Sequence, residues 1–110
     1  MSISWSDFEK ICIRAGTVID VQLFPKAKKP AYKITIDFGA FGIKHSSAQI
    51  TSLYSMEDLP GKQVVAVVNF PPKQIADFFS ECLILGVYNE NNDVVLLQPE
   101  RPVQNGGKIG

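Results

Sequence analysis

One stretch of the sequence decides the fold: Val64-Val65-Ala66-Val67-Val68-Asn69-Phe70-Pro71-Pro72-Lys73-Gln74-Ile75. The five consecutive apolar residues at its start predict a buried strand. Pro71 ends this strand, because proline has no N–H group to donate to a ladder. Asn69 and Lys73 then follow at the mouth of a β core, which predicts a polar, basic rim there.

The segments around this strand alternate between apolar and polar residues. From 11 to 24 the odd positions are mostly apolar, which predicts a long, half-buried strand. Gly16, in its middle, predicts the bend that a small barrel needs in order to close. Residues 32–38 alternate in the same way. The other expected elements are strands at 43–47, 63–70, 81–88 and 94–97, an N-terminal helix capped at Ser4 or Ser6, and a helix or turn at 50–59.

These elements predict an all-β fold, a five-stranded Greek-key barrel of the OB type with short helices at the N-terminus and between strands three and four. The length of 110 residues fits a single domain, 1–110, with one core. No apolar run approaches the roughly 18 residues of a membrane span, and the N-terminus lacks the pattern of a signal peptide. We therefore expect no membrane insertion.

The two cysteines, Cys12 and Cys82, are far apart and fit no metal-ligand spacing. We expect both to be small, reduced residues in or near the core. Because a reducing compartment keeps such thiols free, this usage indicates a cytoplasmic protein.

The net charge is zero, but the charges are unevenly distributed along the chain. Residues 26–73 contain seven lysines against Asp37, Glu57 and Asp58, so this middle carries +4. Residues 1–25 carry −1 and residues 74–110 carry −3. A basic middle predicts one of two things: a positive face that binds RNA in a salt-dependent way, or a solvated surface rich in lysine.

The residue set gives little support for catalysis. His45 is the only histidine, and its neighbours Ser46 and Ser47 point to opposite faces of a predicted strand. No phosphate-binding glycine motif occurs, and no cysteines, histidines or carboxylates cluster as metal ligands. We therefore interpret the chain as a non-enzyme with no catalytic residues, no cofactor and no metal site.

Binding is the function that the remaining residues favour. Lys26, Lys28, Lys29 and Lys33 fit contacts to phosphates as point charges. Asn69 is a candidate for a base edge or a ligand backbone, or else it satisfies a loop amide. Ser80 is expected opposite it, as a ligand contact or as a turn hydroxyl. Phe70, Phe78 and Phe79 form a local excess of aromatic residues, and the adjacent pair cannot both face one core.

Several motifs resemble the tRNA-binding OB-fold domains found at the C-terminus of methionyl-tRNA synthetases and in related accessory proteins. The opening is Asp7-Phe8 followed by Ile11-Cys12-Ile13-Arg14-Ala15-Gly16-Thr17-Val18. Further motifs are similar to the stand-alone CsaA branch of that family. They are Phe24-Pro25-Lys26-Ala27-Lys28-Lys29-Pro30-Ala31-Tyr32-Lys33, Ile36-Asp37-Phe38-Gly39, Ser46-Ser47-Ala48-Gln49-Ile50-Thr51, Asn69 to Ile75, and Ser80-Glu81.

This resemblance implies a small cytoplasmic homodimer that acts as a chaperone related to protein export. It implies unfolded or pre-export polypeptides as ligands, held in an apolar pocket near the dimer interface. Contact with the export machinery and a capacity for tRNA are further implications. The alternative is a dedicated tRNA-binding accessory protein that acts in trans with a synthetase. Because Gln74 and Ala76 stand where the wider motif has basic residues, the expected rim favours peptide over RNA.

The expected site combines residues from the resemblance with residues from the strand pattern. Asn69, Lys73 and Ser80 match the family motif directly, and Lys29 matches its basic loop. Lys33 and Lys44 should point outward if Ile34 and Ile43 point inward. The complete RNA- or peptide-binding set is Lys29, Lys33, Lys44, Asn69, Phe70, Lys73, Phe78 and Ser80, with the phenylalanines as an apolar floor.

Overall fold

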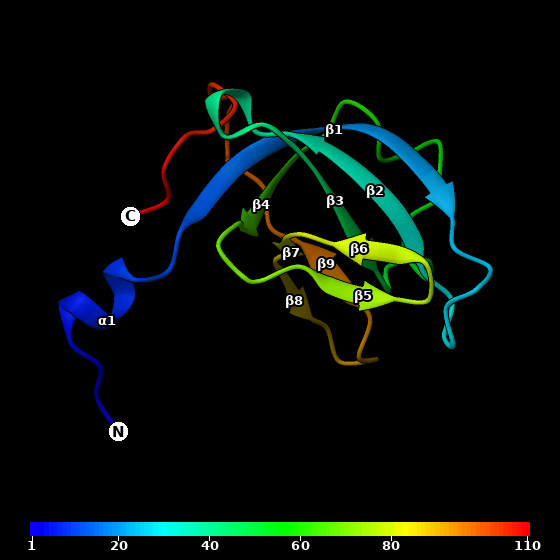
Figure 1. The fold of residues 1–110 in the computed structure, drawn as a ribbon, viewed down its shortest axis with the longest axis horizontal. Coiled ribbons are helices and arrows are strands. Elements are labelled where there is room, and N and C mark those ends of the chain that lie inside the picture. Colours follow the sequence, from blue (N-terminus) through cyan, green and yellow to red (C-terminus); the bar gives the residue numbers. More distant parts are fainter.

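The computed structural model describes residues 1–110 and consists mostly of strands around one apolar core (Figure 1). Five strands form one antiparallel sheet in the order β3-β2-β1-β4-β7, which curls into a nearly closed barrel. The all-β, OB-type expectation is therefore confirmed. The strands of this sheet are β1 (Ile13–Leu23), β2 (Tyr32–Asp37), β3 (Ile43–Ala48), β4 (Gln63–Val67) and β7 (Leu83–Ile84).

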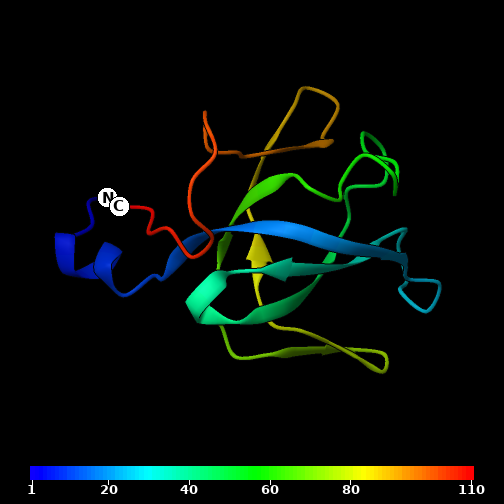
Figure 2. The same cartoon turned by 90° about the horizontal axis from the view of Figure 1, so that it is seen from above.

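Two hairpins accompany the barrel. One pairs β5 (Lys73–Ile75) with β6 (Phe78–Ser80), and the other pairs β8 (Gly86–Tyr88) with β9 (Val94–Leu96). The β5–β6 hairpin lies outside the curled sheet (Figure 2). The sequence predicted a loop in its place. The predicted strand at 81–88 is also divided, because the N–H of Leu85 bonds to Val65 while its carbonyl accepts from Leu97.

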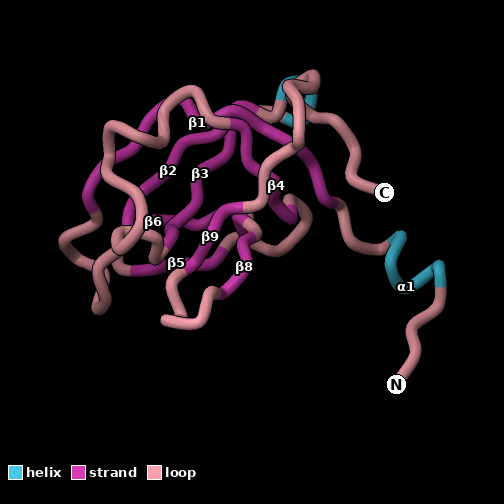
Figure 3. The backbone as a smooth tube through the Cα atoms, turned by 180° about the vertical axis from the view of Figure 1, so that it is seen from behind, coloured by secondary structure: helices cyan, strands magenta, loops and turns pink.

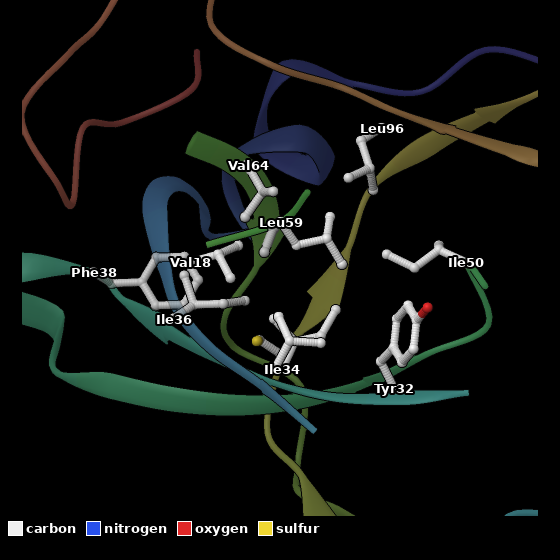
Figure 4. Close-up of a cluster of buried hydrophobic side chains, with 12 residues drawn as sticks. Val18, Tyr32, Ile34, Ile36, Phe38, Ile50, Leu59, Val64 and Leu96 are labelled. Atoms are coloured by element: carbon white, nitrogen blue, oxygen red, sulfur yellow. The ribbon is translucent and has the colours of Figure 1, made fainter. Parts of the chain in front are cut away.

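The core is built where the alternating strands meet. On β2 the predicted pattern is confirmed, with Tyr32, Ile34 and Ile36 buried and Phe38 buried just beyond the strand. Figure 4 shows these side chains together with others from different parts of the chain, among them Val18, Leu59, Val64 and Leu96. The full buried cluster is Val18, Val21, Tyr32, Ile34, Ile36, Phe38, Ile50, Leu59, Val64, Ala66, Cys82 and Leu96.

The alternation along β1 is interrupted by a bulge. The pairing of β1 with β2 shifts register between Val18 and Asp20, and a bulge of this kind reverses which residues face the core. Val18 is buried before it and Val21 after it, whereas Ile19 is 49% exposed. The strand irregularity thus lies beyond Gly16. That glycine is needed for packing, because a Cβ there would lie 2.6 Å from the Phe38 ring.

The N-terminal helix is confirmed as α1 (Trp5–Glu9). Ser4 caps it: the Asp7 N–H donates to Ser4 Oγ at 3.1 Å, and the Ser4 N–H donates to the Asp7 carboxylate at 3.0 Å. These bonds lower the pKa of Asp7, the backbone bond from Ser4 most of all. No residue of α1 is buried, and the helix extends away from the barrel (Figures 1 and 3).

The helix expected between strands three and four does not form, and residues 50–59 make turns only. Ile50 and Leu59, at its two ends, are both inserted into the core. The carbonyl of Tyr54, which a helix would use, instead accepts from the Tyr32 hydroxyl at 2.8 Å. The other helical turn of the chain is η1 (Gly39–Phe41), and no helix has the length and hydropathy needed to span a bilayer.

Candidate binding surface

The β5–β6 hairpin brings three of the predicted site residues together. Phe70, Lys73 and Ser80 line a pocket of ≈ 250 Å³ with Pro71, Cys82 and Leu83, which we call the hairpin pocket. Lys73 and Ser80 are directly opposite each other in the hairpin. The Ser80 hydroxyl also accepts from the Ser47 N–H at 3.1 Å, which ties the hairpin to β3. The pocket therefore has an apolar wall and one ammonium group at its edge.

A second cluster lies where the hairpin meets the outer face of β2. Lys33 Nζ lies 4.9 Å from the ring centroid of Phe24 and 5.4 Å from that of Phe78. The two rings meet edge to face at 5.3 Å. An ammonium group above aromatic faces is stabilised by the ring quadrupoles. We call these three residues the lysine–aromatic cluster. Because Phe24 is buried, the cluster offers a ligand the Lys33 charge and the partly exposed Phe78 ring.

The free lysines near the hairpin make this region positive. Lys26 donates to Asp77 at 2.9 Å, and this bond lowers the pKa of the Asp77 carboxyl. Lys33 and Lys73, at the hairpin, form no salt bridge, and neither does Lys29 in the loop before β2. Their charges are therefore available to a phosphate or another anion.

Asn69 is already occupied within the protein. Its Oδ1 accepts from the Cys12 N–H at 2.9 Å, and its Nδ2 donates to the Lys10 carbonyl at 2.7 Å. The side chain therefore joins the N-terminal segment to the residues after β4. This is the alternative role considered from the sequence, in which the amide satisfies backbone groups.

Lys44 lies apart from the other lysines. It is directly opposite the fully buried Ile36, whereas Lys33 is opposite Ser47, so the two lysines belong to opposite faces of the sheet. The assumption that Ile43 points inward is wrong, since its side chain is 58% exposed. The structure thus joins Phe70, Lys73 and Ser80 in the hairpin pocket, and Lys33 with Phe78 beside it. Lys29, Lys44 and Asn69 belong to neither group.

The sequence reasoning missed Phe24, which completes the lysine–aromatic cluster. Phe24 follows Leu23 at the end of a predicted strand, just before Pro25. Nothing in the local sequence indicates that Phe78 packs against Phe24. His45 is exposed, with Nδ1 3.2 Å from the Thr35 hydroxyl oxygen. No three His, Cys, Asp or Glu side chains gather as a metal-binding group.

Cys82 gives the molecule a pH-dependent contribution to stability. Burial raises the pKa of its thiol to about 11 from the ordinary 9.0. The folded state therefore keeps a proton that the unfolded state releases between pH 9 and 11. We expect the free energy of unfolding to fall by up to about 2–3 kcal/mol as the pH rises through this window, and the contribution to be fully present below it. Urea titrations of the wild-type protein and of Cys82→Ala at several pH values measure this free energy. An equal dependence on pH in the two proteins would contradict the prediction.

Comparison with known proteins identifies the family to which the chain belongs. Residues 13–108 match the family model described as "Putative tRNA binding domain". The methionine–tRNA ligase of Nanoarchaeum equitans is 36% identical over 107 residues, which is 97% of this chain and 13% of the ligase. The chain thus spans only a small part of the curated relatives that it matches. It belongs to the tRNA-binding domain family.

Within this family the chain belongs with the CsaA proteins. The crystal structure of the chaperone CsaA from Bacillus anthracis str. Ames is 51% identical, with a TM-score of 0.94 and full coverage of both chains. The CsaA chaperone from Picrophilus torridus is 49% identical, with a TM-score of 0.93 over 99% of this chain and all of the other. Because the whole-length relatives are chaperones and the ligases share only this domain, the interpretation as a non-enzyme is confirmed.

Proposed function

We propose that this protein is a cytoplasmic, homodimeric chaperone of the CsaA type, formed by one OB domain over residues 1–110. Its ligands are unfolded or pre-export polypeptides, which it presents to the export machinery, and it retains a capacity for tRNA. The observation that carries the proposal is the apolar surface around the hairpin pocket. Phe70 is 54% exposed and Leu83 is 49% exposed, side by side in one pocket lining. Exposed apolar patches of this kind favour apolar segments of other chains.

The capacity for tRNA is supported by a different set of residues. Lys29, Lys33 and Lys73 carry charges without acidic partners, and Lys33 is held over Phe24 and Phe78. Lysines bind phosphates as point charges, and a partly exposed ring such as that of Phe78 stacks on an unpaired base, whereas Phe24 is buried. This arrangement favours the second candidate function, a tRNA-binding accessory protein that acts in trans with a synthetase.

The homodimer is supported by the N-terminal arm, residues 1–10. Trp5 is 85% exposed and Ile3 is 71% exposed. Together with Phe8 and the C-terminal Gly110 they line a hollow of ≈ 510 Å³. A five-residue helix has little stability alone, so an arm with this much exposed apolar surface is best stabilised by a second copy.

One pair of titrations tests which ligand dominates. Labelled tRNA and a labelled unfolded polypeptide are titrated against the same protein over a range of salt concentrations. RNA affinity should fall steeply with salt because counterions are released, whereas apolar peptide affinity should be maintained. Absence of polypeptide binding at every salt concentration would contradict the chaperone function and leave the accessory-protein function.

The triple variant Lys29→Ala/Lys33→Ala/Lys73→Ala separates the two ligands further. We expect weaker tRNA binding, with the slope of log affinity against log salt reduced by about 2–3, because three phosphate contacts are lost. Binding of apolar polypeptide should be largely retained. Lys62→Ala is the matched control, since Lys62 lies before β4 and outside the hairpin. An unchanged salt slope in the triple variant would exclude these lysines from the RNA surface.

A further inference from the structure

A groove separates β3 from β7 at the point where the barrel fails to close. It has a volume of ≈ 540 Å³ and lies apart from the hairpin pocket except for Leu83, which borders both. None of its lining residues carries a charge. They are Ser47, Ala48, Gln49, Ile50, Leu83, Ile84, Leu85, Gly86, Tyr88, Asn92 and Val94, and we call this the edge groove.

The two edges are joined at one end only. There the Glu81 N–H donates to the His45 carbonyl at 2.8 Å, and Ser46 Oγ donates to the Cys82 carbonyl at 2.9 Å. Beyond this point no hydrogen bond joins residues 47–50 to residues 83–86, and β3 and β7 are not paired in the sheet. The barrel is therefore closed at one end of the seam and open at the other.

The β3 side of the groove offers an open backbone edge. In the β2–β3 ladder the Phe38 N–H bonds to the Gly42 carbonyl, which makes these two residues a hydrogen-bonded pair. Hydrogen-bonded and non-hydrogen-bonded pairs alternate along an antiparallel ladder, so the N–H and carbonyl groups of His45 and Ser47 point away from β2. The His45 N–H donates to the Glu81 carboxylate, and the His45 carbonyl accepts from the Glu81 N–H. The Ser47 carbonyl and the Gln49 N–H have no partner within the protein.

The β7 side offers the complementary edge. The Leu85 N–H bonds to the Val65 carbonyl and Leu83 is paired with Val67, so these two residues direct their N–H groups toward β4, while the Leu85 carbonyl accepts from Leu97. Ile84, opposite Ala66, must then direct its N–H and carbonyl away from β4, toward the seam. Unpaired backbone groups along an edge are a template for another strand.

We propose that the edge groove takes up an extended, uncharged polypeptide segment as an added strand, hydrogen-bonded to the edge of Ile84 on one side and to that of Ser47 and Gln49 on the other. This inference rests on the proposed chaperone function and adds to the hairpin pocket a second polypeptide site with a defined mode of binding. Only an extended polypeptide supplies backbone donors and acceptors at strand spacing on both of its sides. The uncharged lining suits an apolar segment and offers nothing to the phosphates of an RNA.

Backbone amide exchange tests the mode of binding directly. The probe is an eight-residue peptide of alternating valine and threonine, added in excess to the full-length protein, with binding followed by a fluorescent label. We expect the amides of Ile84 and Gln49 to exchange rapidly in the free protein and at least about tenfold more slowly with peptide bound. The same peptide with alternate amides N-methylated should lose binding, because it cannot form one of the two ladders.

A pair of variants locates the site. Tyr88→Lys places a charge in the edge groove and should weaken peptide binding at least about tenfold. Val87→Lys adds the same charge at the neighbouring residue of β8, which is exposed but does not line the groove, and should leave binding unchanged.

Each outcome decides the proposal. Bound peptide without protection of Ile84 and Gln49, or equal binding by the N-methylated peptide, overturns strand addition while the chaperone function remains. Protection of both amides before any peptide is added also overturns it, because a second copy of the chain then fills the groove. No binding of any unfolded polypeptide overturns both proposals.

Discussion

Replacing Phe38 with alanine is expected to lower the free energy of unfolding by about 3–5 kcal/mol. The ring is fully buried and fills the space that Gly16 leaves beneath β1. Its removal opens a cavity that the surrounding strands cannot collapse to fill. Since a domain of this size has a total stability of about 5–15 kcal/mol, the variant should be close to unfolding.

Urea denaturation followed by circular dichroism measures this loss. Phe41→Ala is the matched control, because that ring is 42% exposed and has the Arg14 guanidinium 4.1 Å from its centroid. We expect the control to lose less than about 1.5 kcal/mol. Equal losses in the two variants would show that the barrel interior is not the main source of stability.

Trp5→Asp is expected to convert the proposed dimer into a monomer. If the N-terminal arm packs against a second copy, Trp5 is the largest apolar group that this contact covers. Removing such a tryptophan costs about 2 kcal/mol or more, which is roughly a 30-fold increase in the dimer dissociation constant, and a buried carboxylate adds to this. Light scattering at micromolar concentration measures the mass directly.

Ser6→Asp is the control for this experiment. It adds the same charge within the first turn of α1, but Ser6 does not line the hollow formed by Ile3, Trp5, Phe8 and Gly110. It should therefore leave the mass at that of two chains. A monomeric wild-type protein would remove the dimer from the proposed function, and a Trp5→Asp variant that stays dimeric would place the interface elsewhere.

The two proposed ligand surfaces differ in chemistry, so we expect them to bind different ligands. The hairpin region combines free lysines with aromatic rings, so its affinity for an anion should depend on salt. The edge groove has no charged lining residue and offers backbone hydrogen bonds instead. Variants of the lysines and of Tyr88 should therefore affect different ligands.

The local sequence pattern was sufficient to predict the elements that depend on interactions between residues close together in the chain. The alternation at 32–38, the strand that begins at Gln63 and the Ser4 cap all appear in the structure, although β4 ends at Val67 and not just before Pro71. Each depends on strand or helix periodicity, or on a hydrogen bond that spans three residues. The class of fold follows from these elements and from the family motifs.

Local pattern failed where distant contacts override it. The turns at 50–59 replace a helix because the core takes Ile50 and Leu59 and the Tyr32 hydroxyl takes the Tyr54 carbonyl. The bulge after Val18 depends on how β1 and β2 pair, and nothing in the composition of β1 marks it.

The candidate site also combines features that the sequence predicted with features that only the tertiary structure shows. The sequence alone determined that the chain is a β barrel with a basic, aromatic-rich region after its fourth strand, because residue type and spacing carry that information. Only the tertiary structure decided which of those residues meet. It places Lys44 on the face opposite Lys33, commits Asn69 to the N-terminal segment, and leaves the seam between β3 and β7 open. Such groupings depend on strand register and on contacts between residues far apart in the chain, which no local pattern encodes.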